Sequence, residues 1–64
     1  MKARVRALLH EAAALAAYMG REDLVRELEE AIWSGYTARV VRTLRAESHH
    51  LLREIGEEIA KEED

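Results

Sequence analysis

The chain has no cysteine, no proline and no phenylalanine, and only three glycines among its 64 residues. Without cysteine, neither a disulfide framework nor a thiolate metal site can form. No apolar run reaches the length of about 18 residues that a membrane-spanning helix needs, and the N-terminus shows no signal-like apolar core with a cleavage site. We therefore expect a soluble protein, compatible with the cytoplasm, that has no membrane partner.

What the chain does contain is typical of an all-α protein. Its apolar residues are mainly alanine, leucine, valine and isoleucine, and its charged residues are mainly glutamate and arginine. These residue types include the strongest helix formers. A chain this short forms one domain, residues 1–64, and buries only about 60% of its unfolded surface. Such a fold depends on regular helices or on oligomerisation.

The first two predicted helices cover residues 2–19 and 22–33. In the first, apolar residues recur at alternating spacings of three and four, widened by Leu9 and Ala16: Val5, Leu8, Ala12, Leu15 and Met19. This spacing predicts a buried seam, and Gly20 supplies a residue suited to end the helix. In the second helix, the predicted core face contains Leu24, Leu28, Ala31 and Ile32, with Val25 at its edge.

A third helix is predicted over residues 37–62, after a turn at residues 34–37 in which Thr37, or else Ser34, caps the helix. Its expected inner stripe is Val41, Leu44, Ser48, Leu51, Leu52, Ile55 and Ile59. Ser48 could instead cap a separate fourth helix. The predicted architecture is an up-down-up three-helix bundle with short loops, which could assemble into a homo-oligomer. The alternative is a helical hairpin that completes its core only as a dimer.

Charge is unevenly distributed along the chain. Residues 1–20 and 36–53 are basic, whereas residues 21–35 and 54–64 are acidic. Such blocks favour antiparallel neighbours of opposite sign.

One side of the first predicted helix carries no formal charge. We call it the alanine face; it consists of Ala3, Ala7, His10, Ala14 and Ala17. At about 100° per residue it lies almost opposite the buried seam. Small residues at this spacing allow a second helix to approach closely, although alanine could also be present only as a good helix former. Because a solvated face in this chain should carry glutamate or lysine, we interpret the alanine face as an interface.

A second outer stripe is predicted on residues 37–62, and it also has a histidine near its middle: Arg42, Ala46, His49, Arg53, Gly56 and Ala60. Glycine inside a helix costs about 1 kcal/mol relative to alanine, so Gly56 indicates either a close helix approach or a tolerant surface position. The residues that we predict at a protein interface are Ala7, His10, Ala14, Ala17, Tyr18, Arg42, Ala46, His49 and Arg53.

A further set of residues is aromatic and basic: Tyr18, Trp33, Tyr36, Arg39, Arg42 and Arg45. Tryptophan, tyrosine and arginine are the residue types that concentrate binding energy at interfaces. Alternatively, Trp33 and Tyr36 pack at the edge of the core beside the turn at residues 34–37.

Residues 31–44 resemble a bacterial helix-turn-helix unit. The similarity rests on Ala31, Gly35, Val41 and Leu44, at the spacings of the Ala…Gly…Val pattern. It implies that the following helix would read nucleic acid through Thr37, Arg39, Arg42 and Arg45. The chain departs from the pattern at Glu30 and Ser34, where apolar residues are expected, and it is acidic as a whole. A tight turn between packed helices would require the same small and apolar residues.

A metal site is the third alternative. Glu47 and His50 have the carboxylate–histidine spacing of di-iron bundles, but both fall outside the predicted core. Within a helix, the adjacent His49 and His50 would point about 100° apart. No set of nucleophile, base and orienting residue is evident, and so short a helical chain offers little room for a substrate pocket. We expect no enzyme, no cofactor and no small-molecule substrate.

The regularity of residues 20–32 and the terminal Lys61-Glu62-Glu63 resemble computationally designed helical miniproteins. That resemblance implies a helical bundle used as a binder or an assembly unit. The leading hypothesis is therefore a non-enzymatic interaction module that binds a protein partner or a second copy through the outer faces of its first and third predicted helices. The alternative is a small nucleic-acid-binding regulator that uses residues 31–45.

Overall fold

A computed structural model describes residues 1–63, which form four helices and no strand. They are α1 (Ala3–Tyr18), α2 (Glu22–Ser34), α3 (Ala38–Arg45) and α4 (His50–Glu63). The all-α class and the first two helices agree with the sequence prediction. The predicted three-helix bundle is wrong, because residues 37–62 form two helices instead of one.

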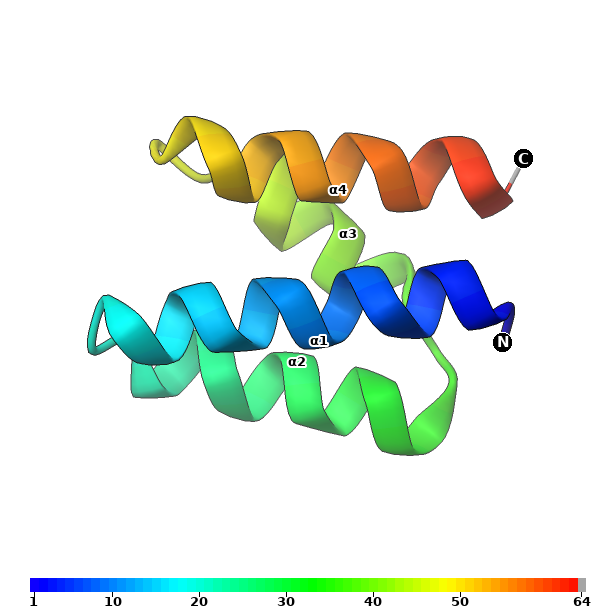
Figure 1. Cartoon of the computed structure of the whole chain (residues 1–64), viewed down its shortest axis with the longest axis horizontal. Helices are drawn as coiled ribbons and strands as arrows, with labels where there is room; N and C mark the ends of the chain where they lie inside the picture. Colours follow the sequence, from blue (N-terminus) through cyan, green and yellow to red (C-terminus); the bar gives the residue numbers. More distant parts are fainter. Residues whose placement is uncertain (64) are drawn as a thin grey trace.

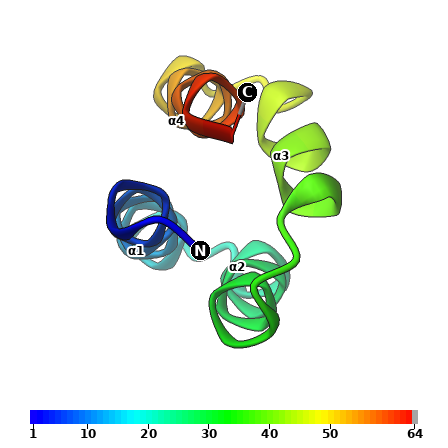
Figure 2. The ribbon, with the colours of Figure 1, turned by 90° about the vertical axis from the view of Figure 1, so that its right-hand side faces the viewer.

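The helices follow one another around a ring, in the order α1, α2, α3, α4 (Figure 2). α1 runs antiparallel to both α2 and α4. The short α3 crosses obliquely between α2 and α4 (Figure 1). The two ends of the chain meet at one end of the bundle, where the Lys2 ammonium group donates a hydrogen bond to the carbonyl of Glu62. Among residues 1–63, no helix combines the length and apolar character needed to cross a membrane.

The break between α3 and α4 is built by side chains that were predicted to lie on an outer helix face. The backbone N–H of Leu51 donates a 3.3 Å hydrogen bond to Nδ1 of His49, the residue before α4. The guanidinium of Arg53 donates to the carbonyls of Glu47 and Ser48, at 3.0 and 2.8 Å. The alternative of a fourth helix near Ser48 is therefore correct, but the imidazole of His49 supplies the side-chain acceptor that a helix start needs.

Gly56 allows α4 to lie directly against α3. A Cβ atom at this position would be 2.8 Å from Cβ of Leu44 and 3.1 Å from the backbone nitrogen of Arg45. Any side chain here would force the two helices apart. Of the two interpretations of Gly56, close helix approach is the correct one, and the neighbouring helix belongs to the same chain.

The core agrees with the predicted seams of α1 and α2 except at Met19, which is exposed, and at Leu15 and Ile32, which are half-buried. The buried apolar residues are Val5, Leu8, Leu9, Ala12, Ala16, Leu24, Leu28, Ala31, Val40, Val41, Leu44, Leu52, Ile55 and Ile59. The predicted inner stripe of residues 37–62 fails at Ser48 and Leu51, which are exposed, and it omitted Val40. The helix break causes this error, since the buried side of α4 no longer continues that of α3.

Arg21 joins the two loops at the other end of the bundle. Its guanidinium makes two parallel hydrogen bonds with the Glu47 carboxylate, at 3.0 and 3.2 Å, and two more of 3.3 Å with Asp23. These bonds raise the pKa of Arg21 above its already high ordinary value and hold the pKa of the Asp23 carboxyl below its ordinary value. The α1–α2 loop and the α3–α4 loop are thereby tied together by a paired, fork-like contact.

Candidate protein-interaction surfaces

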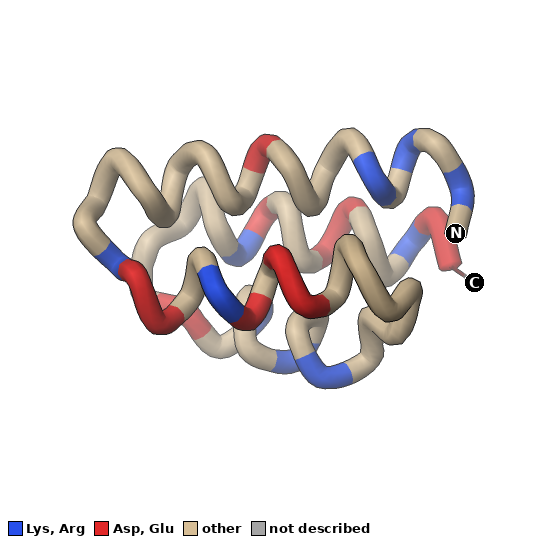
Figure 3. Tube along the Cα trace, turned by 90° about the horizontal axis from the view of Figure 1, so that it is seen from below, with Lys and Arg blue, Asp and Glu red and all other residues tan. Residues whose placement is uncertain are grey.

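Every residue of the alanine face is exposed to solvent. Ala3, Ala7, His10, Ala14 and Ala17 lie on the outer side of α1. Figure 3 shows that α1 carries no charged residue after the acidic segment at its middle, Glu11, in contrast to its N-terminal turns. At about 100° per residue, Arg6 and Glu11 border this face on its two sides, and Arg4 lies farther round the helix. The structure therefore places an uncharged helix face in water.

Tyr18 ends this face and is almost completely exposed, at 91%. At about 100° per residue, it lies between the alanine face and the side of α1 that turns toward α4. An exposed aromatic ring with one polar end is a common anchor of protein interfaces.

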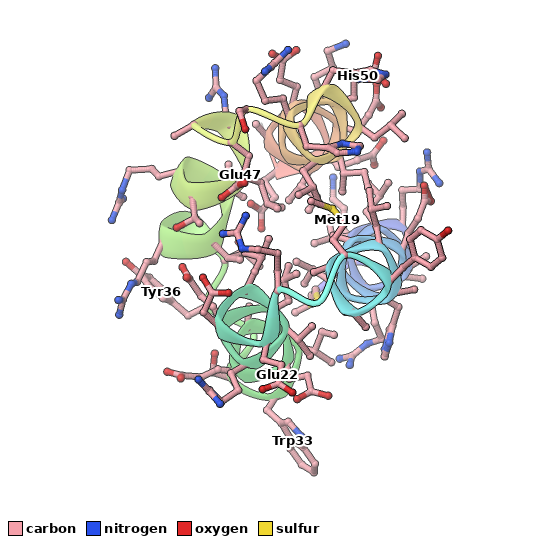
Figure 4. The ribbon with its side chains drawn as sticks, turned by 90° about the vertical axis from the view of Figure 1, so that its left-hand side faces the viewer. Met19, Glu22, Trp33, Tyr36, Glu47 and His50 are labelled. Carbon is pink, nitrogen blue, oxygen red and sulfur yellow. The ribbon has the colours of Figure 1, made fainter. Side chains whose placement is uncertain are left out.

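A groove of about 370 Å³ runs between α1 and α4. We call it the α1–α4 groove. Its apolar floor consists of Leu8, Leu15, Leu51 and Ile55, and its rim of Arg4, Glu11, Glu54 and Glu58. In Figure 4, Met19 extends from the end of α1 toward α4. The groove could not be predicted from the sequence, because Leu51 was expected in a buried stripe and only the orientation of α4 after the break exposes it.

A second groove, of about 320 Å³, lies between α2 and α3 and is mainly polar. We call it the α2–α3 groove; it is lined by Asp23, Arg26, Glu27, Glu30, Ala31, Ser34, Tyr36, Arg39 and Val40. The Glu27 carboxylate accepts a 2.8 Å hydrogen bond from the Thr43 hydroxyl and lies 3.8 Å from the Arg39 guanidinium. One carboxylate of α2 thus holds two side chains of α3.

The second outer stripe does not exist as a single face. Arg42 and Ala46 are exposed, but His49 and Arg53 are half-buried and bonded within the α3–α4 loop. Gly56 is buried and Ala60 is half-buried. The stripe assumed an unbroken helix, and the break turns its two halves to different sides.

The residues of the proposed nucleic-acid surface are also separated. Thr37 is only 6% exposed, and its hydroxyl donates a hydrogen bond to the Glu63 carboxylate. Arg39, Arg42 and Arg45 are all exposed, and the Arg39 guanidinium lies 3.8 Å from the Glu27 carboxylate. Gly35 ends α2 with a φ of 77°, in the left-handed region that glycine adopts readily. The turn thus has the expected glycine, but its basic residues do not form one continuous surface with Thr37.

No family model, curated protein or solved structure matches this chain. The alanine face and the α1–α4 groove adjoin each other on α1.

The aromatic residues near the second turn do not pack at the edge of the core. Trp33 is 90% exposed and extends from α2 away from the other helices, and Tyr36 also points outward (Figure 4). The interpretation of Trp33 as a residue that covers the end of the bundle is wrong. The helical phase of α2 explains the exposure, because Trp33 lies on the same outer side as Glu22 and Glu29.

The histidines and Glu47 have other partners than those expected for a metal site. The rings of His49 and His50 are stacked, with centroids 5.6 Å apart and planes 2° apart. The expected divergence of about 100° does not occur, because His49 lies before α4 begins. Glu47 points toward the interior of the bundle end (Figure 4), where it binds Arg21. Within residues 1–63, no group of three or more His, Asp or Glu side chains is arranged to hold a metal ion.

Proposed function

We propose that the protein is a non-enzymatic helical interaction module that binds a helix of a protein partner, or of a second copy, through the alanine face of α1. The observation that carries this proposal is the exposure of five uncharged positions along α1 in a chain of which 36% is charged. A module of this kind is also what the resemblance to designed helical miniproteins implies.

The chemistry of the alanine face favours helix binding for two reasons. Covering it removes no formal charge from water, so the large desolvation cost of burying an ion does not arise. Its side chains are also small, and the distance between two packed helices depends on the side chains at their contact. Tyr18, at the end of the face, adds a large side chain that loses little conformational entropy when it is ordered.

The proposal uses α1 alone, without the predicted contribution from residues 42–53. His49 and Arg53 already hold the α3–α4 loop, so their polar groups would lose intramolecular bonds if a partner engaged them. Other polar groups of the kinds that catalysis uses also have local roles: the Ser34 hydroxyl accepts a hydrogen bond from the Tyr36 N–H, and Thr37 binds Glu63. These contacts support a binding role rather than a catalytic one.

The test is a double substitution, Ala14→Glu with Ala17→Glu, measured by light scattering over a range of protein concentrations. We expect the parent protein to self-associate, or to bind its partner, and the double variant to remain monomeric because two carboxylates would become buried at the interface. Ala38→Glu is the matched control, since Ala38 is also exposed and helical but lies on α3. The proposal fails if neither the mass nor partner binding responds to the double variant.

Nucleic-acid binding by α2, the turn and α3 is the second candidate, and one observation favours it: Arg42 and Arg45 are both exposed on α3. Against it, Asp23, Glu27 and Glu30 line the neighbouring α2–α3 groove and would repel a phosphate backbone. A duplex titration at about 50 and 200 mM salt separates the two functions, because phosphate contacts produce a steep loss of affinity with salt. Absence of salt-dependent binding removes this candidate.

A further inference from the structure

The α1–α4 groove is a second exposed apolar surface, separate from the alanine face to which binding was assigned above. Its floor is lined by side chains from two antiparallel helices: Leu8, Leu15, Leu51 and Ile55. Leu8 and Ile55 belong to the buried core, whereas Leu15 is half-buried and Leu51 is exposed. The groove therefore connects the core directly with solvent.

Leu51 is the residue that makes this surface unusual. It is 43% exposed, while the adjacent Leu52 is completely buried in the core. Leu51 and Leu15 stand on opposite sides of the floor, one on α4 and one on α1. A helix laid between α1 and α4 could place side chains at i, i+3 or i+4, and i+7 along this floor, which is how amphipathic helices bind grooves.

The rim of the groove specifies the charge of the occupant. Three carboxylates, from Glu11, Glu54 and Glu58, border the floor, and one cation, Arg4, accompanies them. Lys61 lies 3.7 Å from Glu58, but this pair is exposed and contributes little. A second copy of the chain, docked groove to groove, would bring an equally acidic rim against this one, and like charges at an interface are unfavourable.

We propose that the α1–α4 groove binds an amphipathic helix of another protein, in which leucine-like side chains are flanked by lysine or arginine. The apolar side chains of that helix would cover Leu15 and Leu51. Its cations would lie beside Glu11, Glu54 and Glu58. The alanine face adjoins the groove on α1, but none of its residues lines the groove.

The experiment uses a labelled synthetic peptide of about 14 residues, which is about 21 Å long as a helix and matches the length of α4. Its leucines are spaced by three and four, and its other positions are lysine. A second peptide has glutamate in place of every lysine. Fluorescence anisotropy with the full chain should show that the lysine peptide binds at least about tenfold more tightly than the glutamate peptide.

Two variants locate the binding site. Leu51→Lys places a cation in the floor and should weaken binding of the lysine peptide by about tenfold or more. The double variant Glu54→Lys with Glu58→Lys should reverse the preference, so that the glutamate peptide binds more tightly. Glu29→Lys is the matched control, because Glu29 is an exposed carboxylate of α2 that lines neither groove, and it should leave peptide binding unchanged.

Several results would overturn the proposal. It fails if the lysine peptide does not bind, if both peptides bind equally, or if Leu51→Lys and the charge reversal have no effect. It also fails if the parent chain forms a dimer that Leu51→Lys abolishes and that the lysine peptide does not disrupt. The occupant of the groove is then a second copy of the chain. Loss of self-association in the variant of Ala14 and Ala17, with peptide binding intact, would show that the two surfaces act separately.

Discussion

The two grooves of the molecule have similar volumes, about 370 and 320 Å³, but opposite chemistry. In the α2–α3 groove, Glu27 bonds to Thr43 and lies near Arg39, so its polar groups find partners inside the chain. In the α1–α4 groove, Leu15 and Leu51 are left partly in water. Polar groups can be satisfied across a loosely packed contact, whereas apolar surface gains free energy only when water is removed from it. The comparison indicates that the α1–α4 groove, not the α2–α3 groove, is the one suited to a partner.

The largest expected effect is a difference in the free energy of unfolding between variants of two adjacent residues, Leu52 in the core and Leu51 in the groove. Leu52→Ala should lower the free energy of unfolding by about 2–5 kcal/mol, because Leu52 is fully buried and its truncation leaves a cavity. Leu51→Ala should cost less than about 1 kcal/mol, since Leu51 is already 43% exposed. Urea unfolding followed by circular dichroism measures both. Equal losses for the two variants would mean that Leu51 belongs to the core and that the groove floor is not available.

The next effect concerns how α3 is held. Gly56→Val should destabilise the fold by about 1–3 kcal/mol, because its Cβ would meet Leu44 and the backbone of Arg45. Glu57→Val provides the control, since Glu57 is the neighbouring residue of α4 and is exposed. A change of no more than about 0.5 kcal/mol is expected there. If Gly56→Val does not change the free energy of unfolding in the same urea experiment, close packing of Gly56 does not fix α3 against α4. Contacts with α2 across the α2–α3 groove would then be the main interactions that position α3.

The smallest effect is a pH dependence at the border of the α2–α3 groove. The bonds from Arg21 hold the pKa of Asp23 below its ordinary value, which is about 3.9. A lowered folded-state pKa means that Asp23 contributes stability above the unfolded-state value, and that this contribution disappears as the pH falls through the folded-state value. The stability difference between the parent and Asp23→Asn should therefore be constant near neutrality and shrink below about pH 4. A difference that stays constant down to about pH 2 would contradict this assignment.

Much of the N-terminal half could be predicted from the sequence. The helical spacing of Val5, Leu9, Leu24 and Leu28 identified buried positions correctly, because a helix of regular period presents the same residues to the core in any packing arrangement. The same phase placed the alanine face in solvent. Gly20 and Gly35 follow the first two helices, and both adopt the left-handed conformation that glycine allows.

The C-terminal half could not be predicted in the same way. Neither glycine nor proline lies between residues 38 and 55 to mark a break. The break is stabilised by contacts between residues that the local pattern does not connect: Gly56 on Leu44, Arg53 on the loop carbonyls, and Glu47 on the distant Arg21. Each contact requires that the helices are already packed. The expected outer stripe through His49 was therefore wrong, while His49 gained a capping role that its spacing did not indicate.

By itself, the sequence determined the all-α class, the first two helices and the exposed alanine face, because these depend on helix propensity and on a period of about 3.6 residues. Only the tertiary structure decided that α3 and α4 are separate, that Gly56 packs on α3 and that Leu51 lines a groove. The physical reason is that helical phase is continuous only within one helix. Once α4 begins anew at His50, its orientation is set by close packing of Gly56 on α3, and that packing, rather than local spacing, decides which leucines meet water.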